Sequence, residues 1–194
     1  MREAAFMRKT RETTVQMSLQ LDGSGESEIG TGIGFLDHML ELFAKHGKFD
    51  LQMQVDGDLY VDGHHTVEDA GIVLGKGIKD ALGDKKGIRR YGSAVVPMDE
   101  SLAEVAIDLS GRGYLVYNGQ FGQFRQGEFD LELVEEFFRA LALNGEMNLH
   151  INLRYGKNNH HKAEAIFKAF GRALKEAVLV EDEEGDIPST KGVL

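Results

Sequence analysis

The chain has 194 residues, of which 42% are hydrophobic and 28% charged, as in an ordinary globular protein of one domain or of two fused half-size units. A formal net charge of −10 argues against nucleic acid or an anionic membrane surface as the main partner, and no apolar run is long enough to span a bilayer. The absence of cysteine excludes disulfides and thiolate metal sites. Since no secretory signal is visible, we expect a cytoplasmic protein.

Apolar periodicity and turn residues predict the elements of the first half. In chain order they are a strand over residues 13–21, a hairpin turn at 22–25, a helix over 36–46, a strand over 49–55 and a helix over 66–82.

The second half repeats this pattern. Its predicted elements are strands over residues 94–97, 102–109 and 113–117, a helix over 130–143, a strand over 147–153 and a helix over 162–179. We therefore predict an internally duplicated α+β fold, with two helices on one face of a mostly antiparallel or mixed sheet in each half. The half-repeats would span residues 1–91 and 92–194 and form one compact domain.

A His-His-x-x-Glu motif occurs once in each half. His64-His65-x-x-Glu68 recurs 96 positions later as His160-His161-x-x-Glu164. A single motif of this kind can be a solvated helix start with incidental histidines. Two copies in register favour metal binding.

Helix geometry divides the motif residues between two sites. Residues four apart share a helix face, so the first histidine of each motif can lie beside the motif's glutamate. Neighbouring histidines diverge by about 100° and cannot easily bind the same ion. The predicted sites are His64 with Glu68 and His161, and His160 with Glu164 and His65.

The repeat extends upstream of the motifs. Phe49–Met53 aligns with Met147–Ile151 in a register of 98 residues. In that register His38 falls opposite Glu136, and both are potential ligands at equivalent helix positions. We therefore predict His38 as the fourth ligand of one site and Glu136 as the fourth ligand of the other.

Three loops carry basic side chains that suit a phosphate group. They are residues 87–92, with Arg90, residues 110–113, with Arg112, and residues 188–192, with Ser189 and Lys191. Guanidinium groups match phosphate oxygens, and hydroxyl and backbone N–H groups add donors. The alternative is a linker, a turn and a frayed chain end.

Five segments carry a family resemblance: Gly34–Leu40, Asp62–Asp69, Val96–Glu100, Asp108–Arg112 and Pro188–Gly192. Together they resemble imidazoleglycerol-phosphate dehydratase, the lyase of histidine biosynthesis. The resemblance covers nearly the whole chain. It implies two Mn²⁺ ions per active site, a 24-subunit homo-oligomeric cage, and active sites completed by neighbouring subunits.

The resemblance also implies roles for individual residues. One ion would be bound by His38, His65, His160 and Glu164, and the other by His64, Glu68 and His161. The last ligand of the second ion is commonly a His before two Phe residues in this family. Glu136 occupies that position here, which alters the charge and the metal preference of the site.

The remaining residues that the resemblance implies serve the substrate. Around the phosphate it places Arg90, Arg112, Lys168, Ser189 and Lys191. Glu12 becomes the candidate acid/base and a substrate contact. The predicted catalytic residues are Glu12 and the metal-binding carboxylates Glu68 and Glu164.

The implied reaction dehydrates a phosphorylated imidazole substrate, imidazole glycerol phosphate, to imidazole acetol phosphate. An imidazolate ring between two ions would expel the neighbouring hydroxyl and give a diazafulvene-like intermediate, from which Glu12 would take the next proton. Two other functions use the same ligand types. A dinuclear metallohydrolase would cleave generic phosphoesters, and a metal-storage protein would need no phosphate pocket.

Overall fold

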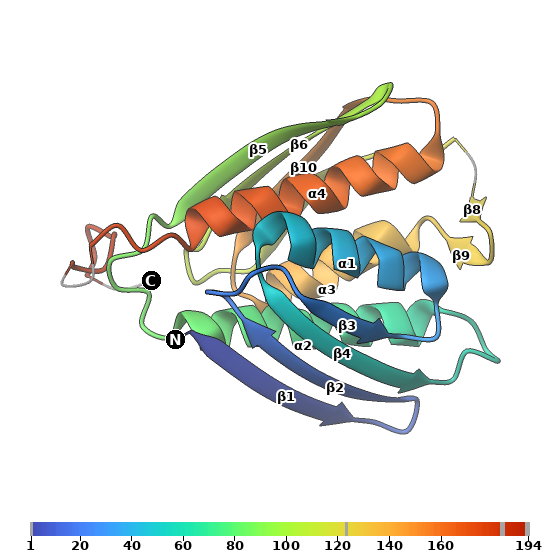
Figure 1. Cartoon of the computed structure of the whole chain (residues 1–194), viewed down its shortest axis with the longest axis horizontal. Helices are drawn as coiled ribbons and strands as arrows, with labels where there is room; N and C mark the ends of the chain where they lie inside the picture. Colours follow the sequence, from blue (N-terminus) through green and yellow to red (C-terminus); the bar gives the residue numbers. More distant parts are fainter. Residues whose placement is uncertain (1, 123, 183–184, 193–194) are drawn as a thin grey trace.

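The computed structural model describes residues 2–122, 124–182 and 185–192. Within these residues, two four-stranded sheets form the outer layers and four helices lie between them (Figure 1). Each half of the chain supplies one sheet and two helices. The predicted α+β class, with its duplicated halves, is confirmed. In the part of the chain that is described, no helix has the length and apolar character to cross a membrane.

The first half contains β1 (Glu3–Lys9), β2 (Thr13–Gln20), β3 (Ser27–Gly30), α1 (Gly34–Gly47), β4 (Asp50–Gly57) and α2 (His64–Leu82). Its sheet has the order β1-β2-β4-β3, and β3 runs parallel to β4. The sequence did not predict β1. Its inward side carries Ala4, Phe6 and then Arg8, so this edge strand lacks the sustained apolar alternation that marks β2.

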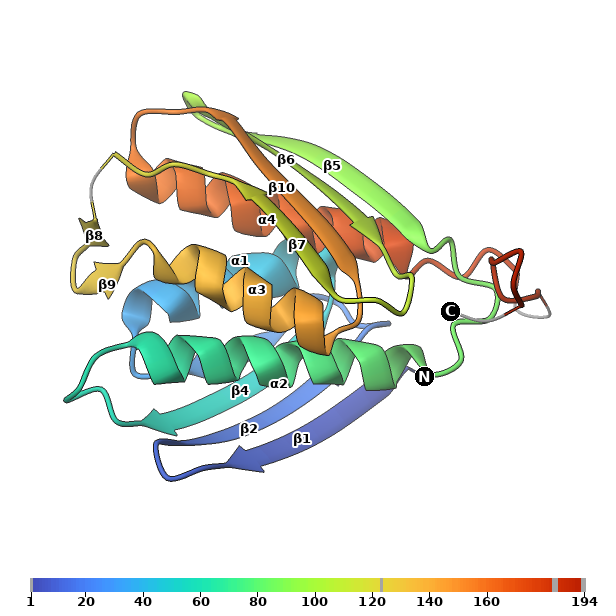
Figure 2. The ribbon, with the colours of Figure 1, turned by 180° about the vertical axis from the view of Figure 1, so that it is seen from behind.

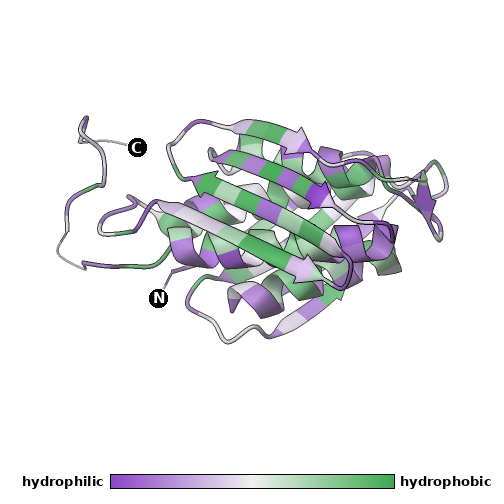
Figure 3. Cartoon of the chain, turned by 90° about the horizontal axis from the view of Figure 1, so that it is seen from above, coloured by the Kyte–Doolittle hydropathy of each residue, from purple (hydrophilic) through white to green (hydrophobic). Residues whose placement is uncertain are grey.

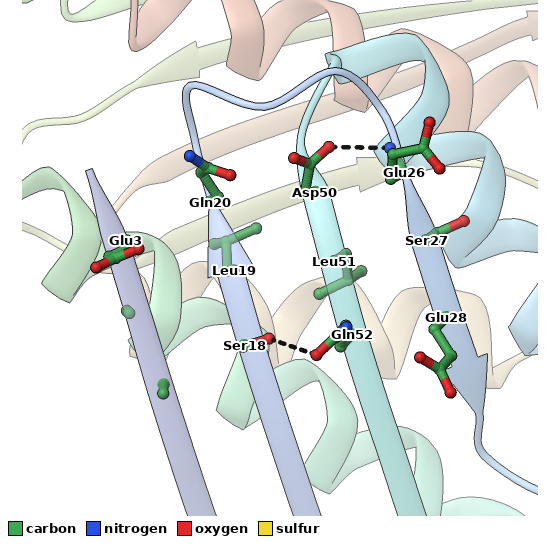
Figure 4. A pocket seen from close by; sticks show the side chains of 12 residues that line it. Glu3, Ser18, Leu19, Gln20, Glu26, Ser27, Glu28, Asp50, Leu51 and Gln52 are labelled. Atoms are coloured by element: carbon green, nitrogen blue, oxygen red, sulfur yellow. Dashed lines mark hydrogen bonds between the residues drawn. The ribbon is translucent and has the colours of Figure 1, made fainter. Parts of the chain in front are cut away.

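The predicted hairpin turn at residues 22–25 is wrong, because β4 lies between β2 and β3. At the start of β4, Asp50 Oδ1 accepts hydrogen bonds from the backbone N–H groups of Ser24, Gly25 and Glu26, at 2.8, 3.0 and 2.9 Å. Figure 4 shows the bond to Glu26. These bonds carry the loop across the end of β4 and direct β3 to its far side.

The second half contains β5 (Tyr91–Met98), β6 (Ser101–Asp108), β7 (Tyr114–Asn118), β8 (Arg125–Gln126), β9 (Phe129–Asp130), α3 (Leu133–Asn144), β10 (Asn148–Tyr155) and α4 (Asn159–Ala177). Its main sheet has the order β5-β6-β10-β7, with β7 parallel to β10. This is the arrangement of the first sheet. The short hairpin β8–β9 has no counterpart in the first half and was not predicted.

The two halves meet through helix pairs, α1 with α4 and α2 with α3 (Figure 2). A Cβ added at Gly171 of α4 would lie 2.6 Å from the backbone oxygen of Phe43 in α1. A Cβ added at Gly75 of α2 would lie 2.5 Å from the backbone oxygen of Leu141 in α3. The repeat relates these two close approaches to each other, so equivalent positions of the two helix pairs carry equivalent side chains.

The core fills the space between the sheets, where the inner faces of the strands meet the helices. Within it, the ring of Phe43 stacks on that of Phe170 and packs at a tilt against that of Phe49, with centroids 5.1 and 5.3 Å apart. The outer face of the second-half sheet shows alternating apolar and polar bands along its strands (Figure 3). That face exposes Tyr91, Val95 and Tyr114, each more than half accessible.

Candidate functional site

Three predicted metal ligands come together where α1 and α4 begin. His38 Nε2 lies 3.2 Å from Glu164 Oε1, and His160 Nε2 lies 2.9 Å from the same oxygen. Ligand atoms of the three residues lie within 4.8 Å of one another. Among the described residues this is the only such group of His, Asp or Glu side chains. We call it the inner triad.

Local structure fixes the positions of these side chains. His160 and Glu164 are four residues apart on α4 and therefore share a face. Asn158 caps the helix, since its side-chain oxygen accepts hydrogen bonds from the backbone N–H groups of His160 and His161. The ring of Phe35 packs edge-on against His160, at 5.4 Å between centroids. The first turn of α4 is thereby held in one geometry.

Glu164 is buried, and its second oxygen accepts a hydrogen bond from Lys168 Nζ at 2.6 Å. Burial acts to raise the pKa of Glu164, but hydrogen bonds from Lys168, His38 and His160 outweigh it and lower that pKa to about 2. The carboxylate is therefore charged at neutral pH. Lys168 was predicted beside the substrate phosphate. In this chain its ammonium contacts Glu164 of the inner triad and lies 3.2 Å from Met98 Sδ, and its contact with the phosphate stays a prediction.

The second histidine of each motif faces different partners. His65 Nδ1 lies 3.1 Å from both carboxylate oxygens of Asp58, and His161 Nδ1 lies 2.7 Å from Glu100 Oε2. These hydrogen bonds raise the pKa of both imidazoles. We call His65 and His161 the outer histidines. Sequence reasoning missed Asp58 and Glu100, because nothing in their spacing links them to the motif.

Each outer histidine also has an exposed carboxylate near its other nitrogen. Nε2 of His65 lies 3.8 Å from Glu12 Oε1, and Nε2 of His161 lies 3.8 Å from Asp99 Oδ2. Glu12, the candidate acid/base, is thus beside a predicted metal ligand. Asp99 holds the same place in the other half, and sequence reasoning did not single it out.

The α2–α3 pair carries the remaining predicted ligands, His64, Glu68 and Glu136. Because this pair repeats the packing of α1 with α4, Glu136 stands where His38 stands in the inner triad. Its carboxylate lies 3.8 Å from Arg139 Nε. In the described residues, neither outer histidine joins the ligand group of its own chain. The α1–α4 pair thus brings three of its four predicted ligands together, whereas His64, Glu68 and Glu136 form no such group within the described residues.

The three basic loops come together in one pocket of about 760 Å³, lined by Arg90, Arg112, Ser189 and Lys191 among others. Arg90 bonds to Asp108 through Nε at 2.7 Å and Nη2 at 3.2 Å. Its Nη1 donates to the backbone oxygen of Pro188 at 2.8 Å, which ties the C-terminal segment to the end of β6. We call this the anion pocket.

Comparison with known proteins identifies the family. The family model described as imidazoleglycerol-phosphate dehydratase matches residues 31–174. Proteins of that name from Listeria monocytogenes serotype 4b (strain F2365) and Geobacillus kaustophilus (strain HTA426) are 59% and 56% identical to the chain, over 194 and 193 residues. The alignments cover 100% of this chain and 100% and 99% of those proteins.

Solved structures agree with the sequence comparison. The crystal structure of imidazoleglycerol-phosphate dehydratase from Staphylococcus aureus subsp. aureus N315 aligns with a TM-score of 0.83 at 44% identity, over 92% of this chain and 99% of that one. The crystal structure of IGPD from Pyrococcus furiosus aligns with a TM-score of 0.83 at 34% identity, over 97% and 100%. The chain therefore belongs to the imidazoleglycerol-phosphate dehydratase family and is a hydro-lyase.

Proposed function

We propose that the chain dehydrates imidazole glycerol phosphate to imidazole acetol phosphate in histidine biosynthesis, and that the reaction depends on metal ions. Family membership supports the reaction and disfavours the hydrolase and storage alternatives. The inner triad supports the metal dependence, because two imidazoles and an ionised carboxylate converge in it.

The donor set fits Mn²⁺, which accepts carboxylate oxygen and imidazole nitrogen, and we propose two such ions per active site. The first would be bound by His38, His160, Glu164 and His65, and the second by His64, Glu68, Glu136 and His161. Because neither outer histidine joins the ligand group of the described residues, the fourth ligand of each ion would come from another copy.

Bound Mn²⁺ would supply Lewis acidity toward the ring nitrogens of the substrate. The side chain of Glu12 is 54% exposed and lies beside His65, which would complete the metal site of another copy. This position suits Glu12 for transferring a substrate proton. Glu68 and Glu164 would serve as ligand carboxylates. The phosphate would be held by Arg90, Arg112, Ser189 and Lys191, and by Lys168, which also hydrogen-bonds to Glu164.

We further propose that the active sites are shared between copies in a homo-oligomer. The family resemblance implies that this homo-oligomer is a 24-subunit cage. The inner triad lies in the first two turns of α4, whereas the backbone N–H of Arg90 bonds to Ala177, the last residue of that helix. Glu164 and the anion pocket are therefore separated by about 20 Å along the helix axis. A glycerol chain joining ring and phosphate is far shorter. One substrate cannot reach both sites of the same chain.

Exposed apolar side chains shortly before the first motif support contact with another copy. Leu59, Tyr60 and Val61 lie in the loop before α2 and are 38%, 91% and 55% exposed. Contiguous apolar residues at the surface commonly mark an interface. A copy packed there would bury this loop and meet His64 and His65.

Metal removal tests the proposed function. Chelation should abolish formation of the ketone product, and Mn²⁺ should restore it. Phosphate release is followed in parallel, because a hydrolase would produce phosphate and no ketone. Full dehydratase activity in a sample verified to be free of metal would contradict the proposal.

A further inference from the structure

The outer histidines share a hydrogen-bonding pattern that the inner triad lacks. Each bonds to a carboxylate through Nδ1, His65 to Asp58 and His161 to Glu100. His38 and His160 instead direct Nε2 at Glu164 inside their own chain. A neutral imidazole that donates its Nδ1–H to a carboxylate has no proton on Nε2, which is then available as a ligand.

Glu100 is itself held in place. Its Oε1 accepts hydrogen bonds from the backbone N–H groups of Asn158 at 2.6 Å and Lys157 at 3.0 Å, and Ser101 Oγ lies 3.1 Å away. These contacts leave Oε2 for His161. The backbone that fixes the carboxylate also leads into α4, so the same segment holds the carboxylate and His161.

Asp58 is held in a comparable way. Its side chain is 13% exposed, and its backbone N–H bonds to the oxygen of Glu12 at 3.1 Å. Both carboxylate oxygens face Nδ1 of His65. The ring is therefore oriented before any ligand arrives.

The internal duplication does not explain why both pairs exist. His65 and His161 are equivalent in the repeat, but their carboxylates are not. Asp58 follows β4 and lies 7 residues before its histidine, whereas Glu100 lies in the turn between β5 and β6, 61 residues before its own. The same pairing is built twice from unrelated loops, which points to a requirement of the histidine and not to inheritance from one ancestral half.

We infer that Asp58 and Glu100 are positioning residues, which fix the tautomer and ring orientation of His65 and His161 so that Nε2 of each is presented to a metal ion held by another copy of the chain. This inference rests on the proposed function, because it assumes that the outer histidines are ligands. Outer-shell partners of this kind contribute about 10- to 100-fold to metal affinity.

Glu100→Gln provides a sharp test. Because Oε1 is occupied by two backbone N–H groups, the new amide nitrogen would face Nδ1 of His161 and donate to it. The ring proton would then move to Nε2, where it blocks metal binding. We expect Mn²⁺ affinity at one of the two sites per chain to fall about 10- to 100-fold. The Co²⁺-loaded variant should show a changed absorption spectrum.

The measurement is a Mn²⁺ titration followed by electron paramagnetic resonance, on assembled protein checked by its size. His161→Ala should lose the same ion. Glu146→Gln, which alters an exposed carboxylate paired with Lys79, is the matched control and should titrate like the parent. The double variant of Glu100→Gln and His161→Ala should lose no more affinity than His161→Ala alone, because Glu100 acts through that ring.

Two results would overturn the inference. One is parental Mn²⁺ affinity in Glu100→Gln while His161→Ala loses an ion, which leaves the proposed function intact. The other is an additive loss in the double variant, which would mean that Glu100 only stabilises the fold. If Glu100→Gln fails to assemble, Asp58→Asn with His65→Ala repeats the comparison on the first motif. If His161→Ala and His65→Ala both keep two ions, the inference and the proposed ligand set fail together.

Discussion

Gly171→Ala should separate α4 from α1 and weaken the inner triad. The new Cβ would lie 2.6 Å from the backbone oxygen of Phe43, about 0.8 Å short of the 3.4 Å at which ordinary contact begins. The obstacle is helix backbone, which cannot rotate away. Overpacking of this kind costs about 1–3 kcal/mol, and alanine recovers only about 1 kcal/mol through its helix propensity.

We therefore expect the free energy of unfolding to fall by up to roughly 2 kcal/mol. Mn²⁺ affinity should fall with it, because a ligand shift of several tenths of an ångström exceeds the tolerance of about 0.2 Å in metal–ligand distances. His160 and Glu164 lie on the displaced helix and His38 does not. Urea denaturation of metal-free protein measures the first effect, and a Mn²⁺ titration measures the second.

Gly77→Ala in α2 is the matched control. Its Cβ would lie 2.3 Å from the terminal methyl of Met17, a flexible side-chain end that can move aside. This variant should be as stable as the parent or slightly more stable, with unchanged metal affinity. Equal stability and equal Mn²⁺ affinity in the Gly171 and Gly77 variants would refute the argument from helix contact.

Glu136→His should raise the affinity of the second site for Zn²⁺ relative to Mn²⁺, measured by competitive titration, because imidazole replaces a hard oxygen donor; an unchanged ratio would mean that Glu136 is not a ligand. Removing residues 189–194, of which 193 and 194 lie outside the described residues, should raise KM and leave both metals bound; near-normal kinetics would show a chain end with no role. Asp50→Asn should lower the free energy of unfolding by about 1 kcal/mol in urea at neutral pH. Hydrogen bonds from backbone N–H groups, that of Glu26 first, lower the pKa of Asp50. The stabilisation by the Asp50 carboxylate is therefore fully present above pH 3.8 and is lost as pH falls through the lowered pKa. If the variant stays less stable than the parent in acid, the carboxylate is not the cause of the difference.

The sequence was most informative where the signal is local or repeated. The motif pair and the two registers predicted which helices carry ligands, and equivalent glycine contacts at Gly75 and Gly171 confirm the duplication. The helix starts were predicted slightly late, at residues 66 and 162. The helices begin at His64 and Asn159, because side chains of Asp62 and Asn158 accept the first free N–H groups.

Features that depend on contacts distant in sequence could not be predicted. The position of β3 depends on Asp50, and the orientation of His161 depends on Glu100, 61 residues away. Lys168 is different, because its spacing of four residues from Glu164 is a readable helical ion pair. The contact of Lys168 with Glu164 could therefore have been predicted from the sequence.

Under the proposed function, one active site combines the inner triad of one copy with the anion pocket of another. Mixing two inactive variants tests it directly. His160→Ala lacks a working triad and keeps its pocket, whereas Arg112→Ala keeps the triad and lacks the pocket. The two variants are unfolded, mixed in equal amounts and reassembled. Active sites that combine the intact triad of an Arg112→Ala chain with the intact pocket of a His160→Ala chain should restore up to about a quarter of parental activity. Activity no higher than that of the separately reassembled variants, in assemblies shown to contain both chains, would contradict the account.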